Sequence, residues 1–124
     1  MKLTLAEAAI GAGAVLEAPA SIAQAGTITV SGYSIDSRTV AAGELFFAVR
    51  GERLDGHNYV AAAFERGAVA AVVSRARVAT LPDAALAMPL LLAEDTLIAL
   101  QALAAHVRRQ WGKRLVAVTG SAMC

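Results

Sequence analysis

Two polar clusters near the middle of the chain carry residue types that could bind an anionic ligand. The first covers residues 36–38 and reads DSR, and the second covers residues 51–57 and reads GERLDGH. Hydroxyl, guanidinium, imidazole and free backbone N–H groups together suit a phosphorylated ligand that also forms hydrogen bonds. An apolar stretch, residues 45–49, separates the clusters. We predict that it is a strand that holds both clusters at one edge of a sheet.

The first cluster stands where a strand should end, and it has two interpretations. In the functional one, Ser37 and nearby backbone amides bind phosphate or sugar oxygens, with Arg38 close by. In the structural one, Asp36 accepts backbone N–H bonds within a turn, and Arg38 points into solvent. Taken alone, the triplet is more typical of the turn.

The second cluster contains two glycines and four ionisable side chains. Gly51 would let a ligand approach the backbone closely, so that the three residues after it could line a base or sugar pocket. Alternatively, Asp55-Gly56 is a turn signal and His57 simply precedes a helix. The loop alone leaves both interpretations open.

The end of the chain is similar to a strand that leads into a phosphate-binding loop. Residues 115–121 read LVAVTGS, which predicts a strand over 115–118 and a turn at Thr119, Gly120 and Ser121. Such a loop also needs a lysine for the β- and γ-phosphates of ATP. Met123 and Cys124 follow instead. We therefore expect no ATP chemistry from this sequence by itself.

No other part of the sequence has the spacing of a catalytic centre. No nucleophile stands near a base. His57 and His106 are far apart and Cys124 is the only cysteine, so no metal site is predicted. His106 and Trp111 lie on or next to an expected helix, where they should pack rather than react or stack on a base.

The elements that must position these clusters alternate between strand and helix. A capping box at Thr4 and Glu7 should begin a short helix that ends near Gly11 and Gly13. Residues 27–30 and 33–36 should form a hairpin. Further along we expect strands at 45–49, 70–73, 90–93 and 115–118, and helices at 59–66 and 96–110. This order predicts an α/β fold in which helices flank a mixed β-sheet.

Composition narrows the class of protein. A length of 124 residues suits one domain, and a net charge of +1 with interspersed signs argues against a broad nucleic-acid surface. No apolar run reaches the roughly 18 residues that would span a membrane. The start of the sequence lacks the features of a secretory signal, and a single cysteine agrees with a reducing compartment. We expect a cytoplasmic protein with no nucleic-acid or membrane partner.

Taken in order, these segments resemble the N-terminal domain of a Mur ligase of the MurE/MurF type. The matching segments are 36–38, 43–48, 51–52, 55–57, 62–68, 70–73, 95–96, 99–100 and 116–121. The resemblance favours the MurF type for two reasons. Gly51-Glu52 followed by Asp55-Gly56-His57 is closer to the MurF pattern, and Thr119-Gly120-Ser121 ends in serine where MurE usually has threonine.

The resemblance implies a cytoplasmic three-domain ligase of peptidoglycan synthesis. Such an enzyme uses ATP and Mg²⁺ to join D-alanyl-D-alanine to a UDP-N-acetylmuramoyl tripeptide. Residues 1–114 would be the domain that binds the UDP end, and 115–124 the first strand and cut start of the ATP-binding loop of a central domain. Its partners, the central and C-terminal domains, would be missing. The chain alone is then expected to be inactive and to hold no cofactor.

The resemblance also assigns the UDP site by position. The expected UDP contacts are Ile35, Ser37, Glu52, Arg53 and Leu54, and the residues expected to shape the site are Arg38, Asp55 and His57. The alternatives are a MurE-type domain and a structural or interaction domain in which both clusters only make turns. A self-sufficient small enzyme is disfavoured, because the sequence has no nucleophile, metal set or complete phosphate loop.

Overall fold

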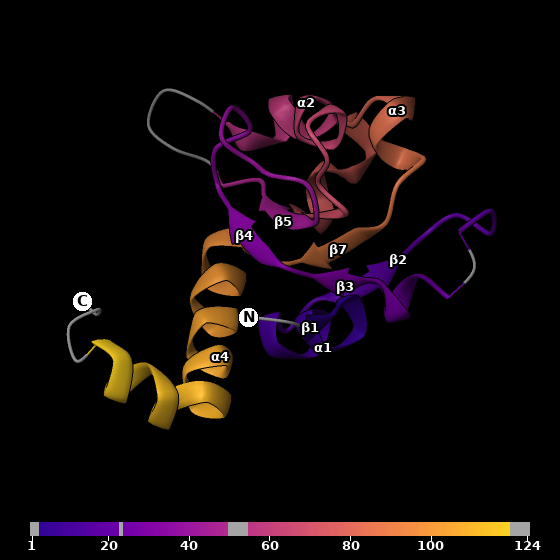
Figure 1. Ribbon diagram of the computed structural model, residues 1–124. Helices are drawn as coiled ribbons and strands as arrows, with labels where there is room; N and C mark the ends of the chain where they lie inside the picture. Colours follow the sequence, from indigo (N-terminus) through magenta and orange to yellow (C-terminus); the bar gives the residue numbers. More distant parts are fainter. Residues whose placement is uncertain (1–2, 23, 50–54, 120–124) are drawn as a thin grey trace.

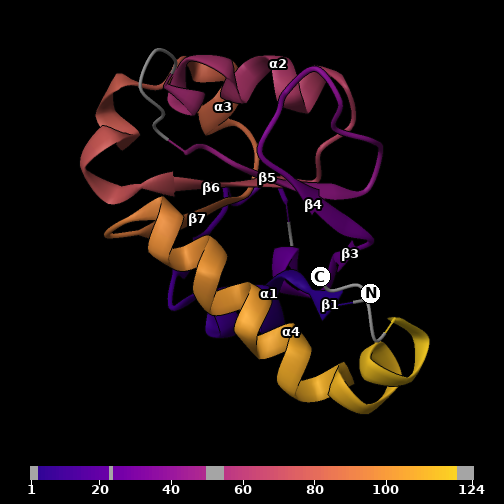
Figure 2. The ribbon, with the colours of Figure 1, turned by 90° about the vertical axis from the view of Figure 1, so that its left-hand side faces the viewer.

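A five-stranded sheet divides the protein into two layers of helices (Figure 1). The computed structural model describes residues 3–22, 24–49 and 55–119, with side chains as far as residue 109. Helices α2 (Val60–Glu65) and α3 (Asp83–Leu86) cover one face of the sheet. Helices α1 (Leu5–Ala12) and α4 (Thr96–Thr119) lie on the other, as the turned view in Figure 2 shows. The predicted α/β architecture, a mixed sheet flanked by helices, is confirmed.

The sheet is mostly parallel, with one antiparallel edge. Its order is β2-β7-β6-β5-β4, and β4 to β7 run parallel while β2 pairs antiparallel with β7. The bounds are β2 Val15–Glu17, β4 Gly32–Ser34, β5 Glu44–Phe47, β6 Ala70–Ser74 and β7 Leu90–Ala93. Short 3₁₀ helices η1 (Ala25–Thr27), η2 (Gly56–Tyr59) and η3 (Arg75–Thr80) occur in the connections.

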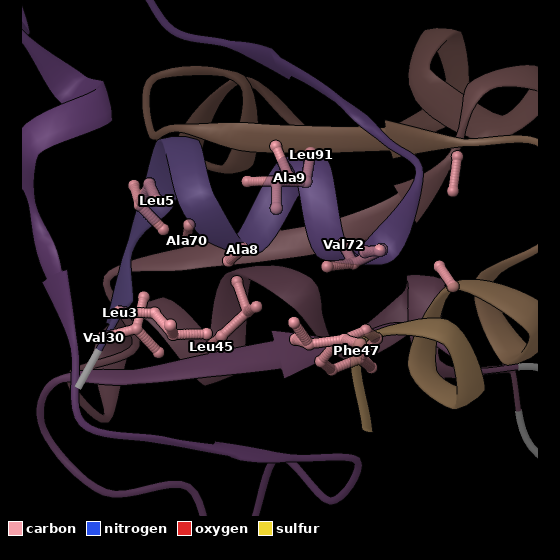
Figure 3. Close-up of a cluster of buried hydrophobic side chains, with 14 residues drawn as sticks. Leu3, Leu5, Ala8, Ala9, Val30, Leu45, Phe47, Ala70, Val72 and Leu91 are labelled. Carbon is pink, nitrogen blue, oxygen red and sulfur yellow. The ribbon is translucent and has the colours of Figure 1, made fainter. Parts of the chain in front are cut away.

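The strand side chains alternate between two apolar cores. Leu45 and Phe47 of β5 face α1 and α4, whereas Phe46 faces α2 and α3. Successive side chains of a strand point to opposite faces, so a strand covered on both sides must be apolar throughout. This explains the unbroken apolar runs of residues 70–73 in β6 and 90–93 in β7, both of which the sequence predicted as strands. Figure 3 shows the core between α1 and the sheet, where Ala8 and Ala9 of α1 lie near the strands.

Helix α1 begins and ends as its sequence predicts. Thr4 Oγ1 accepts from the backbone N–H of Glu7 at 3.1 Å, and Glu7 Oε1 accepts from the N–H of Thr4 at 3.0 Å. The helix ends at Gly13, whose φ of 70° is left-handed. The capping box and the stop at Gly13 are therefore confirmed, whereas Gly11 lies inside the helix, which continues to Ala12.

The predicted hairpin over 27–36 is wrong. β3 (Thr29–Val30) pairs with β1 (Leu3–Thr4) in a separate two-stranded sheet, and β4 pairs in parallel with β5. The buried Val30 side chain packs into the core beneath the main sheet. Between the two strands, Ser31 N donates to Gly43 O at 2.9 Å. Burial of Val30 and this bond send the two halves of the proposed hairpin to different partners.

Helix α4 runs through the segment predicted as a final strand. Asp95 Oδ1 accepts from Leu97 N at 2.9 Å and from Ile98 N at 3.2 Å, so Asp95 caps the start of the helix. Residues 115–118 then continue the helix and form no strand. A helix satisfies its backbone groups within itself, whereas a strand needs a neighbour. The assignment of 115–124 to another domain stays a prediction. No helix in the described ranges is long and apolar enough to cross a membrane.

Candidate ligand-binding cleft

A cleft of about 630 Å³ opens above the carboxyl ends of β4 and β5, beside α2. Its lining comes from the turn after β4, the end of β5, η2 and α2: Ile35, Asp36, Ser37, Arg38, Phe46, Val49, Gly56, Tyr59, Ala62, Glu65 and Arg66. In open α/β sheets, ligands bind outside the carboxyl ends of parallel strands. The volume is within the range of small-molecule sites.

The first polar cluster forms a tight turn on one wall of the cleft. Asp36 Oδ1 accepts from the backbone N–H of Arg38 at 2.8 Å and from its Nε at 3.1 Å. Asp36 Oδ2 accepts from Arg38 Nη2 at 2.9 Å. The side-chain bond from Arg38, then the backbone bond, lowers the pKa of Asp36 from 3.8 to about 2. The structural interpretation is thus present, yet the same turn also lines the cleft.

Gly56 brings the second cluster against the end of β5. Its N–H donates to Val49 O at 3.0 Å. A Cβ at this position would lie 2.8 Å from Val49 N and 2.9 Å from Ala48 Cα, which are fixed backbone atoms. Only glycine allows the loop to approach β5 this closely. Gly56 also lines the cleft, and we call this position the cleft floor.

Asp55 and His57 lie behind the floor, outside the cleft lining. Asp55 Oδ1 accepts from the backbone N–H of His57 at 3.0 Å and lies 2.7 Å from His57 Nδ1. Arg77 of η3 pairs with the other oxygen, Oδ2. His57 Nε2 accepts from the N–H of Ser74 at 2.9 Å. Burial raises the pKa of Asp55, but the bonds from Arg77 and His57 outweigh it and hold that pKa well below its usual range.

The predicted site residues divide into four groups, of which Asp55 and His57, outside the cleft lining, are one. Ile35, Ser37 and Arg38 line the cleft, together with Gly56 from the second cluster. Glu52, Arg53 and Leu54 lie outside the described residues. Of the proposed ATP-loop residues, Thr119 ends α4, and Gly120 and Ser121 are also outside the described residues.

One wall of the cleft, along η2 and α2, was not predicted from the sequence. Tyr59, Ala62 and Arg66 are three or four residues apart, a spacing that places side chains on one face of a helix. Arg66 lies close enough to the first cluster that its charge helps to lower the pKa of Asp36. The spacing was visible in the sequence, but only the fold shows which element this face meets.

The described lining of the cleft mixes apolar and polar residues. Among the described residues, the lining combines apolar Phe46 and Val49 with the partly exposed Tyr59, and it also contains Ser37 and the two arginines Arg38 and Arg66. Two carboxylates, of Asp36 and Glu65, balance the two arginines. Within the described part of the chain, no three His, Cys, Asp or Glu side chains gather as a metal ion would require.

Comparison with known proteins agrees with the fold. Residues 29–110 match the family described as Mur ligase family, catalytic domain. The chain is 37% identical over 92 residues to the UDP-N-acetylmuramoyl-tripeptide–D-alanyl-D-alanine ligase of Bacillus subtilis, covering 74% of this chain and 19% of that one. It is 41% identical over 103 residues to the UDP-N-acetylmuramoyl-L-alanyl-D-glutamate–2,6-diaminopimelate ligase of a Chelativorans species, covering 83% and 20%.

A solved structure is also similar. MurF from Acinetobacter baumannii matches with a TM-score of 0.69 and 26% identity, over 89% of this chain and 22% of that one. The chain therefore spans about a fifth of the length of these relatives.

Proposed function

The chain belongs to the Mur ligase family, and we propose that its cleft binds the UDP end of a UDP-N-acetylmuramoyl tripeptide. The observation that carries this proposal is the meeting of Ile35, Ser37 and Arg38 in one cleft with Tyr59 and Arg66. These residues combine a planar apolar surface with hydroxyl and guanidinium donors. A nucleoside diphosphate has a planar base at one end and negative charge at the other.

The two ends of UDP would meet different walls. The base would lie against Tyr59 and Ile35, since an aromatic ring stacks on a base whatever its hydrogen-bond pattern. The diphosphate would lie toward Ser37, Arg38 and Arg66. Asp36 occupies Nε and one hydrogen of Nη2 of Arg38. The other guanidinium N–H groups remain available as donors.

For the parent enzyme we propose the MurF type, which adds D-alanyl-D-alanine in peptidoglycan synthesis. The similarity to a diaminopimelate ligase supports the MurE type as a second candidate. The names of both relatives begin with UDP-N-acetylmuramoyl, so the UDP proposal applies to either type. Joining the chain to the remainder of a relative and measuring which amino acid or dipeptide is added would separate the two.

The ligase activity itself would need more than this chain. We propose that ATP and Mg²⁺ bind in the parts of the relatives that this chain does not cover. We propose that the chain alone binds the nucleotide in the cytoplasm without turning over ATP. ATP hydrolysis by the purified chain would contradict this.

The proposal is tested by titrating the ¹⁵N-labelled chain with UDP and following amide shifts. The amides of residues 35–38 and of Tyr59 and Ala62 should move together. Uridine should move mainly the Tyr59 side, and pyrophosphate mainly Ser37 and Arg38. Unchanged shifts at millimolar UDP would instead favour a structural or interaction domain.

Variants inside and outside the cleft lining test whether UDP binds in the cleft. Ser37→Ala and Arg66→Ala should weaken UDP binding. Arg75→Ala is the control, because Arg75 is also an exposed arginine but pairs with Glu94 at 3.1 Å away from the cleft lining. If Arg75→Ala weakens binding as much as Arg66→Ala, the effect is one of general charge and the site assignment is wrong.

A further inference from the structure

His57 is a buried titratable side chain that the proposed UDP site does not contact. The side chain is 4% exposed, and both ring nitrogens have partners. A backbone N–H can only donate, so Nε2 must accept the bond from Ser74. The proton of the ring then lies on Nδ1 and is donated to Asp55 Oδ1. The contacts therefore require a neutral ring in a single tautomer.

The position of Ser74 explains why a side chain is needed there. Ala48 N donates to Val72 O at 2.9 Å, in the parallel pairing of β5 with β6. If the ladder continued, the N–H of Ser74 would bind Ala48 O. That oxygen instead accepts from the buried Thr96 hydroxyl at 2.8 Å. The strands thus separate at the cleft, and His57 supplies the acceptor that β5 no longer offers.

The same arrangement fixes the cleft floor. Gly56 stands between Asp55 and His57 in sequence and donates to Val49 O at 3.0 Å. Asp55 is held by Arg77, and His57 is held by β6. The Gly56 peptide is therefore anchored on both sides. Tyr59, which lines the cleft, ends the same 3₁₀ helix that begins at Gly56.

We propose that His57 is a positioning residue for the nucleotide. Its neutral Nδ1–H tautomer ties the loop to the end of β6, and this contact holds Gly56 and Tyr59 where the base and its sugar meet the cleft. The inference rests on the proposed function for the identity of the ligand. The hydrogen-bond geometry itself does not depend on UDP.

The tautomer is tested on the ligand-free ¹⁵N-labelled chain. We expect a pyrrole-type nitrogen shift for Nδ1 and a pyridine-type shift for Nε2 of His57. We also expect a scalar coupling across the hydrogen bond between the Ser74 amide nitrogen and Nε2. A ring protonated on Nε2, or an absent coupling, would overturn the proposal whether or not UDP binds.

Two near-isosteric variants separate the two ring contacts. His57→Gln places a carbonyl oxygen near the position of Nε2 and keeps an acceptor for Ser74. His57→Asn places an amide near the position of Nδ1 and does not reach Ser74. The asparagine variant should weaken UDP binding about tenfold, the effect of one lost hydrogen bond in a positioned network, and should speed hydrogen exchange at Gly56 N–H. The glutamine variant should stay close to wild type in both measurements.

The outcomes distinguish this inference from the proposed function. If wild type does not respond to UDP, the proposed function fails, while exchange at Gly56 still tests the positioning role. If wild type binds UDP and His57→Asn binds equally tightly, the positioning role is overturned. Should the asparagine variant fail to fold, the glutamine variant decides: a loss of binding or protection there overturns the role. Arg75→Ala should change neither measurement.

Discussion

In both polar clusters, an aspartate Oδ1 accepts the backbone N–H two residues later. The bond from Arg38 N to Asp36 measures 2.8 Å, and the bond from His57 N to Asp55 measures 3.0 Å. Each aspartate also pairs with an arginine, Asp36 with Arg38 and Asp55 with Arg77. At the level of local structure, the two clusters are built in the same way.

Their surroundings differ. The side chains of Asp36 and Arg38 are 37% and 84% exposed, whereas those of Asp55 and His57 are 17% and 4% exposed. An exposed turn leaves guanidinium N–H groups available to a ligand. A buried turn must use its polar groups within the protein, because unpaired buried groups are costly. Burial therefore separates a cluster that faces the cleft from one that holds the cleft in place.

The largest expected effect comes from removing the carboxylate of Asp55, which is only partly exposed. Asp55→Ala leaves the Nδ1–H of His57 and the guanidinium of Arg77 without their partner, which should lower the free energy of unfolding by about 3 kcal/mol. Urea denaturation followed by circular dichroism measures this change. Asp36→Ala is the matched control, with a much smaller loss because its groups reach water. Equal losses would show that burial does not distinguish the clusters.

A substitution in the cleft floor should give the next largest loss of stability. Gly56→Ala should lower the free energy of unfolding by about 2 kcal/mol, because its Cβ would collide with the backbone of β5. Gly13→Ala is a useful control: its φ is 70° but the space around it is open. There we expect about 1 kcal/mol from backbone strain alone. Only Gly56→Ala should also reduce the UDP response, and a similar reduction in Gly13→Ala would contradict the assignment of the floor.

Sequence reasoning succeeded where local chemistry decides the structure. The capping box at Thr4, the left-handed stop at Gly13 with φ of 70° and the strand from Leu90 to Ala93 depend on neighbours in the chain or on a simple apolar pattern. The turn at Asp36 belongs to the same class. In the structure, this turn becomes a wall of the cleft because β4 and β5 run parallel, so that their carboxyl ends lie together.

The failures lie where distant contacts decide. The short apolar run at 115–118 suits either a strand or a buried helix turn, and periodicity cannot separate the two. The bond from Ser74 to His57 joins residues 17 apart and arises only because β5 and β6 separate. Likewise, Arg66 becomes a cleft residue only through the packing of α2 above the sheet. The sequence does not show which distant element each of these residues meets.

Separate replacement of Arg38 and Arg77 by alanine tests the comparison of the two clusters. The first variant should affect ligand binding, and the second should affect stability. Arg38→Ala should weaken UDP binding about fivefold, the effect of one charge-assisted contact, and leave the unfolding transition nearly unchanged. Arg77→Ala should lower the free energy of unfolding by about 1 kcal/mol, since its guanidinium is 34% exposed and partly screened. Calorimetric UDP titration and urea denaturation of both variants give the four values. Parallel losses in both variants would mean that the clusters share one role.

The smallest effect is a titration at the exposed cluster. The bonds from Arg38 lower the pKa of Asp36 from 3.8 to about 2. Because the folded pKa is depressed, the contribution of this turn to stability is complete above the unfolded pKa and is lost as the pH falls through about 2. A carboxyl ¹³C titration should show this midpoint in wild type and a rise toward 3.8 in Arg38→Ala. A midpoint that stays near 2 in that variant would mean that Arg66 or the backbone, rather than the Arg38 side chain, holds the charge on Asp36.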